Sequence, residues 1–315
     1  ALLYCLWSPG INGAGGKFDL RQNAIWLGHG WLGDDHWFDR NRRDIQQFRS
    51  TEKIDTLLQR LNRNHIKYVY PHLCPAQRNG AVAAYNSAQL ELFLNVAQKY
   101  DIKVIPWIGG VWETSARIDE VLWRKNFVAS VKELLDKHPR LAGVQINIEP
   151  LPSGNPEFLT LLEEFRPVLQ GRIIGVAAYP PPTKWHPHPN VHWDLHYLHE
   201  VASRCDQMAV MMYDTAIKFE KIYINLMRQW TNELGTALNN TKCQLLLGLP
   251  AYEDVDVGYH RPAVENLRTA LSGIQAAGPG GNYIGCAIYC EWEMTAEKWQ
   301  VWQKFFLIRQ HNNKL

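Results

Sequence analysis

The regular alternation of apolar, strand-like runs with amphipathic, helix-like runs most restricts what this chain can fold into. Eight runs are interpreted as strands, at residues 23–31, 66–73, 103–110, 143–149, 172–179, 207–214, 244–250 and 283–291. Each is followed by a helical pattern, at roughly 51–64, 87–100, 121–138, 156–169, 192–205, 220–238, 263–277 and 295–308. Because a closed parallel barrel needs eight such repeats, the sequence predicts a single-domain α/β fold, the (β/α)8 or TIM barrel.

An open, doubly wound parallel sheet is the main alternative, and it would carry a glycine-rich phosphate turn after its first strand. GHGWLG at 28–33 has the glycine spacing, but the following DDHWFDRNRRD does not read as the start of a helix. We therefore predict a barrel over residues 23–309, an N-terminal extension at 1–22 and a tail at 310–315. The opening ALLYCLW is interpreted either as a strand or as the remnant of a longer natural N-terminus.

Composition excludes several classes of partner. The 33 basic residues nearly balance 31 acidic ones, which favours neither nucleic acid nor an anionic membrane as a partner. No run of eighteen or more apolar residues occurs, so we expect no membrane span. The six cysteines form no C-x-x-C pair and no zinc spacing with histidine. We expect no metal and no cofactor, and a monomeric chain.

The stretch WHPHPNVHWDLH at 185–196 contains four histidines. Its spacing fits no tetrahedral zinc motif well, and its prolines predict a loop. Histidine and tryptophan at a barrel rim are more commonly sugar contacts or part of a lid. That hypothesis requires residues 183–193 to lie at the cleft.

Aromatic residues are the one compositional excess, with 13 Trp and 13 Tyr. Active sites of such barrels lie at the C-terminal ends of the strands, where flat rings with a polar group suit sugar faces. Any single tryptophan, however, is more commonly part of a large core. The candidate sugar contacts at the strand ends are Trp31, Tyr70, Trp107, Tyr252, Tyr289 and Trp292.

The fourth predicted strand, GVQINIE at 143–149, places Gln145, Asn147 and Glu149 on one face and apolar residues on the other. Because the apolar face must meet the helices, the polar face points into the barrel, with Glu149 nearest the rim. A carboxylic acid in a partly dry barrel mouth has a raised pKa and can donate a proton near neutral pH. Ordinary glycosidases need two carboxyl groups. The second must come from another strand, or the substrate must supply its own nucleophile.

Four stretches resemble, in order, the motifs of family 18 of the glycoside hydrolases, the chitinases and their relatives. AGVQINIE at 142–149 is similar to the D-G-x-D-x-D-x-E signature and ends on Glu149. IGG at 108–110 resembles S-x-G-G, MMYD at 211–214 resembles M-x-Y-D, and GLPAY at 248–252 resembles G-L-P-x-Y. The four motifs lie on the expected strands and run through most of the chain, which makes the resemblance specific.

The resemblance implies a retaining, substrate-assisted glycosidase that cleaves after an N-acetylhexosamine, as endo-β-N-acetylglucosaminidases and chitinases do. Glu149 would protonate the leaving oxygen and later act as the base, while the substrate's 2-acetamido carbonyl attacks the anomeric carbon. Asn147, Tyr213 and Asp214 would position the acetamido group, with Gln145 supporting them from below. An N-acetylglucosamine-containing glycan as substrate would favour a secreted or periplasmic location.

The departures from the signature concern its three Asp positions, which hold Ala142, Gln145 and Asn147. Asparagine cannot carry a negative charge, but it can hydrogen-bond the amide, and INIE also resembles the N-x-E signature of the family 85 endo-β-N-acetylglucosaminidases. Asn147 is therefore a natural solution of that kind, the mark of a catalytically inactive, lectin-like carbohydrate-binding relative, or an engineered Asp→Asn. The sequence favours the first, because the acid and the strand-six Tyr-Asp pair are both present.

The eighth predicted strand departs as well. Its GCAIYCEW places Tyr289 where the family has a tryptophan, and Trp292 follows three residues later.

Overall fold

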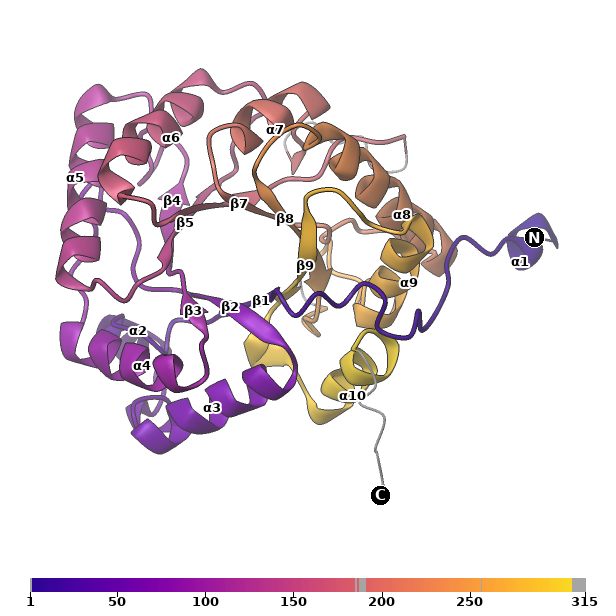
Figure 1. Ribbon diagram of the computed structural model, residues 1–315, viewed down its shortest axis with the longest axis horizontal. Coiled ribbons are helices and arrows are strands. Elements are labelled where there is room, and N and C mark those ends of the chain that lie inside the picture. Colours follow the sequence, from indigo (N-terminus) through magenta and orange to yellow (C-terminus); the bar gives the residue numbers. More distant parts are fainter. Residues whose placement is uncertain (1, 185, 187–190, 256, 308–315) are drawn as a thin grey trace.

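The protein is a barrel of parallel strands surrounded by helices in a computed structural model, which describes residues 2–184, 186, 191–255 and 257–307 (Figure 1). One parallel sheet has the strand order β3-β2-β1-β9-β8-β7-β6-β5-β4. Its strands are β1 (Asn23–Leu27), β2 (Ile66–Pro71), β3 (Lys103–Val104), β4 (Trp107–Val111), β5 (Gly143–Glu149), β6 (Ile173–Ala178), β7 (Gln207–Val210), β8 (Gln244–Pro250) and β9 (Tyr283–Tyr289).

The ends of this sheet meet at β2, β3 and β4. β3 and β4 are two parts of the third predicted strand, separated at Pro106, which has no backbone N–H to donate. Ile105 N donates to Val69 O at 3.0 Å, and a parallel bridge joins His72 to Trp107. The sheet therefore closes on itself, and the predicted (β/α)8 fold is confirmed.

Helices surround the strands (Figure 1), and eight of those in the described residues correspond to the eight predicted ones. They are α3 (Thr51–Arg63), α4 (Ser87–Lys99), α5 (Val121–Lys137), α6 (Pro156–Leu169), α7 (Leu195–Ala202), α8 (Glu220–Ala237), α9 (Leu267–Ala277) and α10 (Ala296–Phe305). α7 and α9 begin later than predicted, because Asp194 and Asn266 accept hydrogen bonds from the backbone of the first turn and so act as N-caps.

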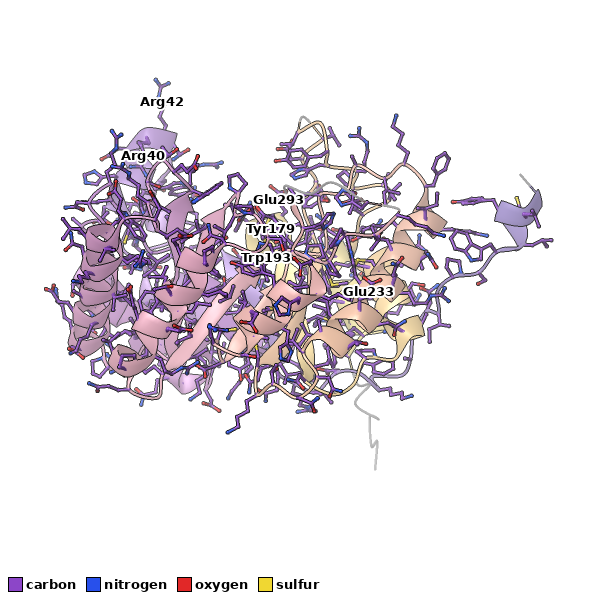
Figure 2. The ribbon with its side chains drawn as sticks, turned by 90° about the horizontal axis from the view of Figure 1, so that it is seen from above. Arg40, Arg42, Tyr179, Trp193, Glu233 and Glu293 are labelled. Atoms are coloured by element: carbon purple, nitrogen blue, oxygen red, sulfur yellow. The ribbon has the colours of Figure 1, made fainter. Side chains whose placement is uncertain are left out.

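Two further helices correct the sequence interpretation. The opening stretch contains α1 (Leu2–Leu6), so it is a helix and the strand alternative is wrong. The stretch after β1 contains α2 (Asp35–Asn41), whose start is fixed by Asp34 accepting from Trp37 N at 3.2 Å. From its C-terminal end, Arg42 projects away from the barrel (Figure 2). Short 3-10 turns lie at Ile45–Gln47 and Glu291–Glu293.

The core has two layers, one between the barrel and the helices and one inside the barrel. Inside, Trp26 Nε1 donates to Gln145 Oε1 at 2.8 Å, and the Tyr70 hydroxyl donates to Gln207. The Trp26 contact shows that the polar face of β5 points inward. Burying these amides costs little because their polar atoms are paired.

Residues 10–22 of the predicted extension pack on the barrel rather than hanging free. Ile11 N donates to Ser272 O at 3.1 Å on α9, and the Tyr283 hydroxyl donates to Phe18 O at 2.9 Å. The predicted tail at 310–315 lies outside the described residues. Among the helices that the structure describes, none has the length and apolar character to cross a membrane.

Candidate active site

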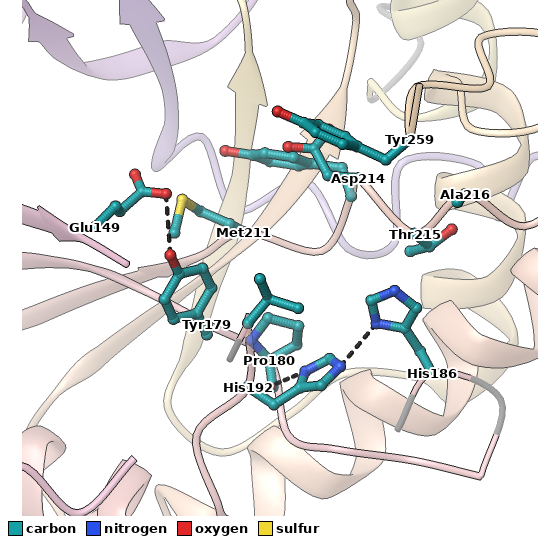
Figure 3. Close-up of a pocket in the computed structure, with 12 residues that line it drawn as sticks. Glu149, Tyr179, Pro180, His186, His192, Met211, Asp214, Thr215, Ala216 and Tyr259 are labelled. Carbon is teal, nitrogen blue, oxygen red and sulfur yellow. Dashed lines mark hydrogen bonds between the residues drawn. The ribbon is translucent and has the colours of Figure 1, made fainter. Parts of the chain in front are cut away.

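A cavity of about 440 Å³ opens at the C-terminal ends of β5, β6 and β7 (Figure 3). Its walls combine carboxyl groups, tyrosines and histidines from segments far apart in sequence. The lining residues are Glu149, Tyr179, Pro180, His186, Val191, His192, Met211, Tyr213, Asp214, Thr215, Ala216 and Tyr259.

Glu149 is the last residue of β5 and enters this cavity from the barrel side. Its Oε2 accepts a hydrogen bond from the Tyr179 hydroxyl at 3.2 Å (Figure 3). Burial raises the pKa of Glu149, and hydrogen bonds from Asn147 and Tyr179 oppose that rise. The carboxyl group therefore keeps its proton to a higher pH than an exposed glutamate, as a proton donor requires.

Asn147 lies two residues earlier on the same inward face. Its side chain hydrogen-bonds Glu149, which leaves Oδ1 buried and without a hydrogen-bond partner among the described residues. An unpaired buried carbonyl oxygen is costly and calls for an N–H donor. Opposite Asn147 on β4 stands Gly109, where a Cβ would lie 1.6 Å from the Asn147 backbone oxygen. Gly109, the first glycine of the IGG motif, therefore lets β4 pass close beside Asn147.

Tyr213 and Asp214 follow β7, which ends at Val210 rather than continuing to 214 as predicted. The Tyr213 ring stacks on Tyr289, with centroids 4.9 Å apart and planes 13° apart. Asp214 has a left-handed backbone, φ 62°, which is uncommon for a residue with a side chain and is often found at functional sites. This turn directs the Asp214 carboxyl group into the cavity.

Asp214 is also electrostatically perturbed. Burial, together with the negative charges of Glu265 and Glu149, raises its pKa to about 7. Its Oδ1 lies 3.0 Å from Nε2 of His260. The cavity thus contains a second carboxyl group, contributed by a different strand from Glu149.

Glu265 is a site residue that sequence reasoning missed. Its side chain is completely buried behind the turn at Asp214. It accepts from Thr215 N at 3.1 Å, from the Tyr252 hydroxyl at 2.6 Å and from the Thr215 hydroxyl. Burial raises its pKa, and these hydrogen bonds oppose the rise. Glu265 therefore anchors the segment that carries Asp214. No strand-end pattern marks it, because it lies in the loop before α9.

Four of the predicted sugar contacts, Trp31, Trp107, Tyr289 and Trp292, line a second cavity of about 750 Å³, at the C-terminal ends of β1 and β9 and the start of β4. Trp292 is 48% exposed and its ring lies 5.6 Å from that of Tyr289, so it presents a free face. Trp107 and Tyr289 are half-buried. These three rings are placed where a bound sugar could contact them.

Trp31 also borders this cavity but is mainly structural. It is buried, its Nε1 donates to Glu291 Oε2 at 3.3 Å, and its ring packs edge-on against Phe48. Only the margin of the ring is available to a ligand.

Three other predicted contacts lie below the surface. Tyr70 has no exposed surface and packs inside the barrel, so it does not reach a sugar as predicted. Tyr252 is 4% exposed, and its ring stacks on His260 at 4.0 Å, so it supports the site instead of offering a platform. Gln145 is 1% exposed and lies beneath Asn147 on β5. Strand parity correctly gave their direction, but the depth of each side chain decides what it contacts.

The described part of the histidine-rich stretch lies at the cleft, since His186, Val191 and His192 line the cavity of Glu149. His192 Nδ1 lies 2.8 Å from Pro180 O and its Nε2 lies 2.7 Å from His186 Nδ1 (Figure 3). Because a carbonyl oxygen only accepts, His192 Nδ1 donates, which fixes its tautomer. Residues 185 and 187–190 of this stretch lie outside the described residues.

A separate group that could hold a metal was also missed. Among the described residues, His29, Asp34 and His72 bring candidate ligand atoms within 4.8 Å of one another. The histidines follow the neighbouring strands β1 and β2, and this adjacency was the available signal.

Comparison with known proteins places these features in a family. The family described as glycosyl hydrolases family 18 matches residues 38–266. No curated protein matches the chain in sequence.

Solved structures with similar folds share little sequence with this chain. The spore cortex-lytic enzyme SleL of Bacillus cereus has a TM-score of 0.62 at 10% identity, covering 91% of this chain and 75% of SleL. A chitinase from Chromobacterium violaceum has a TM-score of 0.60 at 15% identity, covering 90% and 98%. A chitinase from Rhizomucor miehei has a TM-score of 0.58 at 13% identity, covering 91% and 100%. At such identities the likeness shows a common fold.

Proposed function

The chain belongs to family 18 of the glycosyl hydrolases, and from this premise we propose that it is a retaining, substrate-assisted glycosidase acting after an N-acetylhexosamine. The observation that carries the proposal is the environment of Glu149. It is a carboxyl group with a raised pKa, hydrogen-bonded to Tyr179 at the wall of an open cavity. A group of this kind serves as a general acid near neutral pH.

In the first proposed step, Glu149 gives its proton to the glycosidic oxygen as the bond from that oxygen to the anomeric carbon breaks. The carbonyl oxygen of the substrate's own 2-acetamido group forms the new bond to the anomeric carbon, giving a cyclic oxazolinium ion. In the second step, water attacks the anomeric carbon and loses a proton to the Glu149 carboxylate. The ring reopens, and two inversions give net retention of configuration.

Asn147 supports this route through its unpaired Oδ1. The N–H of a substrate acetamido group would supply the missing donor, and that hydrogen bond would orient the carbonyl oxygen toward the anomeric carbon. Asparagine cannot neutralise the positive charge that develops on the acetamide nitrogen. We assign that electrostatic role to Asp214, which shares the cavity with Glu149.

The aromatic residues divide into two roles in this proposal. Tyr213, stacked on Tyr289, forms the floor beneath the reacting sugar, and its hydroxyl contacts the acetamido group. Trp107 and Trp292 bind further sugar units in the cavity that they line. Monomeric state and a secreted or periplasmic location stay predictions, as does the resemblance to family 85.

One observation favours a rival, a catalytically inactive carbohydrate-binding protein: the signature Asp is Asn147. Incubation of wild type and Glu149→Gln with chitin oligomers, N-glycans and peptidoglycan fragments separates the two, with products read by mass spectrometry. An enzyme releases an oligosaccharide that the variant does not release. A binding protein releases nothing, and wild type and variant bind the same glycans with equal affinity.

A further inference from the structure

His29, Asp34 and His72 form a compact group at the C-terminal rim of the barrel, outside the residues assigned to catalysis. His29 Nδ1 lies 3.0 Å from Asp34 Oδ2, and the two imidazole rings lie 3.7 Å apart between centroids. The candidate ligand atoms of all three residues lie within 4.8 Å of one another. Asp34 is buried, and His29 keeps 36% of its side chain exposed.

A second, independent observation is an unsatisfied buried nitrogen on His72, one of the three residues. His72 is only 6% exposed, and its Nδ1 is buried with no hydrogen-bond partner in the part of the chain that the structure describes. The neighbouring Trp107, whose ring centroid lies 4.4 Å from that of His72, is packed against it and supplies no acceptor or donor to that nitrogen. Buried polar nitrogens are normally paired, so this one calls for a partner.

We propose that His29, Asp34 and His72 bind one divalent transition-metal ion, with zinc as the best match. Two imidazoles and one carboxylate are the ligands of zinc sites that keep a position open for water or a further ligand. Ligand atoms about 2.0–2.2 Å from zinc in a tetrahedron stand roughly 3.3–3.6 Å from one another. His29 Nδ1 and Asp34 Oδ2, 3.0 Å apart, are close to this spacing, and small side-chain rotations would bring all three ligand atoms to it.

The surroundings permit metal binding. Asp34 uses Oδ1 to cap α2, which leaves Oδ2 for a metal. Arg40 Nη2 lies 3.3 Å from Oδ2 and competes for that oxygen. Its side chain is 60% exposed, so it can turn into solvent when the ion binds (Figure 2). The Trp37 ring lies parallel to His29, 6.0 Å away, and restrains the imidazole.

The three residues lie beside a different cavity from the one that Glu149 lines. His29 and Trp107 line the cavity of about 750 Å³, so the open position of the ion faces a space sized for a ligand. Oxygen atoms of a bound ligand, such as a hydroxyl pair or a carboxylate, would complete the coordination there.

The test is a titration with zinc chloride of protein first stripped of metal. The titration is measured by isothermal calorimetry. We expect one zinc per chain, and we expect His29→Ala, His72→Ala and Asp34→Asn each to weaken binding at least ten-fold. Asp34→Asn keeps an oxygen to cap α2, and His29 is partly exposed, so these two variants test the site if His72→Ala fails to fold. His36→Ala is the matched control, because His36 is an exposed histidine on α2 outside the group.

A second readout identifies the ligands. Cobalt(II) in place of zinc gives the visible absorption of a low-coordinate site, which His29→Ala removes and His36→Ala keeps. Absence of one-to-one binding in wild type overturns the proposal. So does equal affinity for zinc in wild type, Asp34→Asn and His29→Ala.

Discussion

Replacing the buried Glu265 by glutamine tests how the turn that carries Asp214 is held. Three donors, Thr215 N, the Thr215 hydroxyl and the Tyr252 hydroxyl, converge on the Glu265 carboxylate. Glutamine keeps the shape but replaces one acceptor oxygen by an NH2 group that meets a donor. The loss of one charge-assisted hydrogen bond is expected to reduce the free energy of unfolding by about 1.5–3 kcal/mol.

The same change acts on Asp214 through charge. The negative charge of Glu265 is one cause of the raised pKa of Asp214, so Glu265→Gln is expected to lower that pKa below about 7. Urea denaturation at neutral pH measures the stability change. The pH dependence of the thermal midpoint reports the pKa of Asp214. Glu253→Gln is the control. Glu253 is an exposed rim residue paired with Lys298, and such a pair contributes about 0–1 kcal/mol.

A change of less than about 0.5 kcal/mol in Glu265→Gln would refute this reasoning. It would mean that Glu265 is already protonated and donates a hydrogen bond as glutamine does. An unchanged titration of Asp214 would independently refute the electrostatic link.

Three further predictions follow from the site and its surroundings. Asp214 ionises near pH 3.8 when unfolded and near 7 when folded, so the unfolded chain binds fewer protons between these values and stability falls as the pH rises through them. Asp214→Asn removes this loss of stability, so the thermal midpoint of the variant minus that of wild type is expected to increase from about pH 4 to about pH 8. A difference that stays constant over this range would contradict the raised pKa of Asp214. Gly109→Ala places a Cβ 1.6 Å from Asn147 O and is expected to lower the free energy of unfolding by at least about 1–3 kcal/mol, measured by urea denaturation. Gly235→Ala on α8, where a Cβ meets nothing within 4 Å, is expected to leave the stability unchanged or to raise it. Equal effects of the two changes would contradict the close approach of β4 to Asn147. Trp292→Ala is expected to weaken glycan binding about ten-fold in calorimetry, which corresponds to roughly 1–1.5 kcal/mol of binding free energy lost with the ring contact. Phe219→Ala, a change of another exposed aromatic residue, is expected to leave the affinity unchanged. Unchanged affinity in both variants would show that Trp292 does not contact the glycan.

The fold was predictable from the sequence because its determinants are periodic. Buried parallel strands give short apolar runs and amphipathic helices give a repeat of 3.6, so their alternation shows directly in the letters. The helix α2 escaped because it has seven residues and buries only Phe38, too little to give a periodic signal. Its start depends on the Asp34 cap, which is a local hydrogen bond.

The candidate site was predictable where direction along a strand decides a role. Period-two alternation placed Gln145, Asn147 and Glu149 inside the barrel, and the structure agrees. The same reasoning could not give depth, so it assigned Tyr70 to the substrate although that side chain is fully buried. Glu265 could not be found at all, because it acts through loop contacts with Thr215, 50 residues away in sequence.

The rate loss of Glu149→Gln on two leaving groups tests the central proposal, that Glu149 is the proton donor, most directly. Cleavage of an N-acetylglucosamine oligomer needs protonation of the leaving oxygen, whereas 2,4-dinitrophenolate leaves without it. We expect the variant to lose about 10²–10⁴-fold in kcat/KM on the oligomer and far less on the dinitrophenyl N-acetylglucosaminide. Equal losses on both substrates, or an active variant on the oligomer, would contradict the assignment of Glu149.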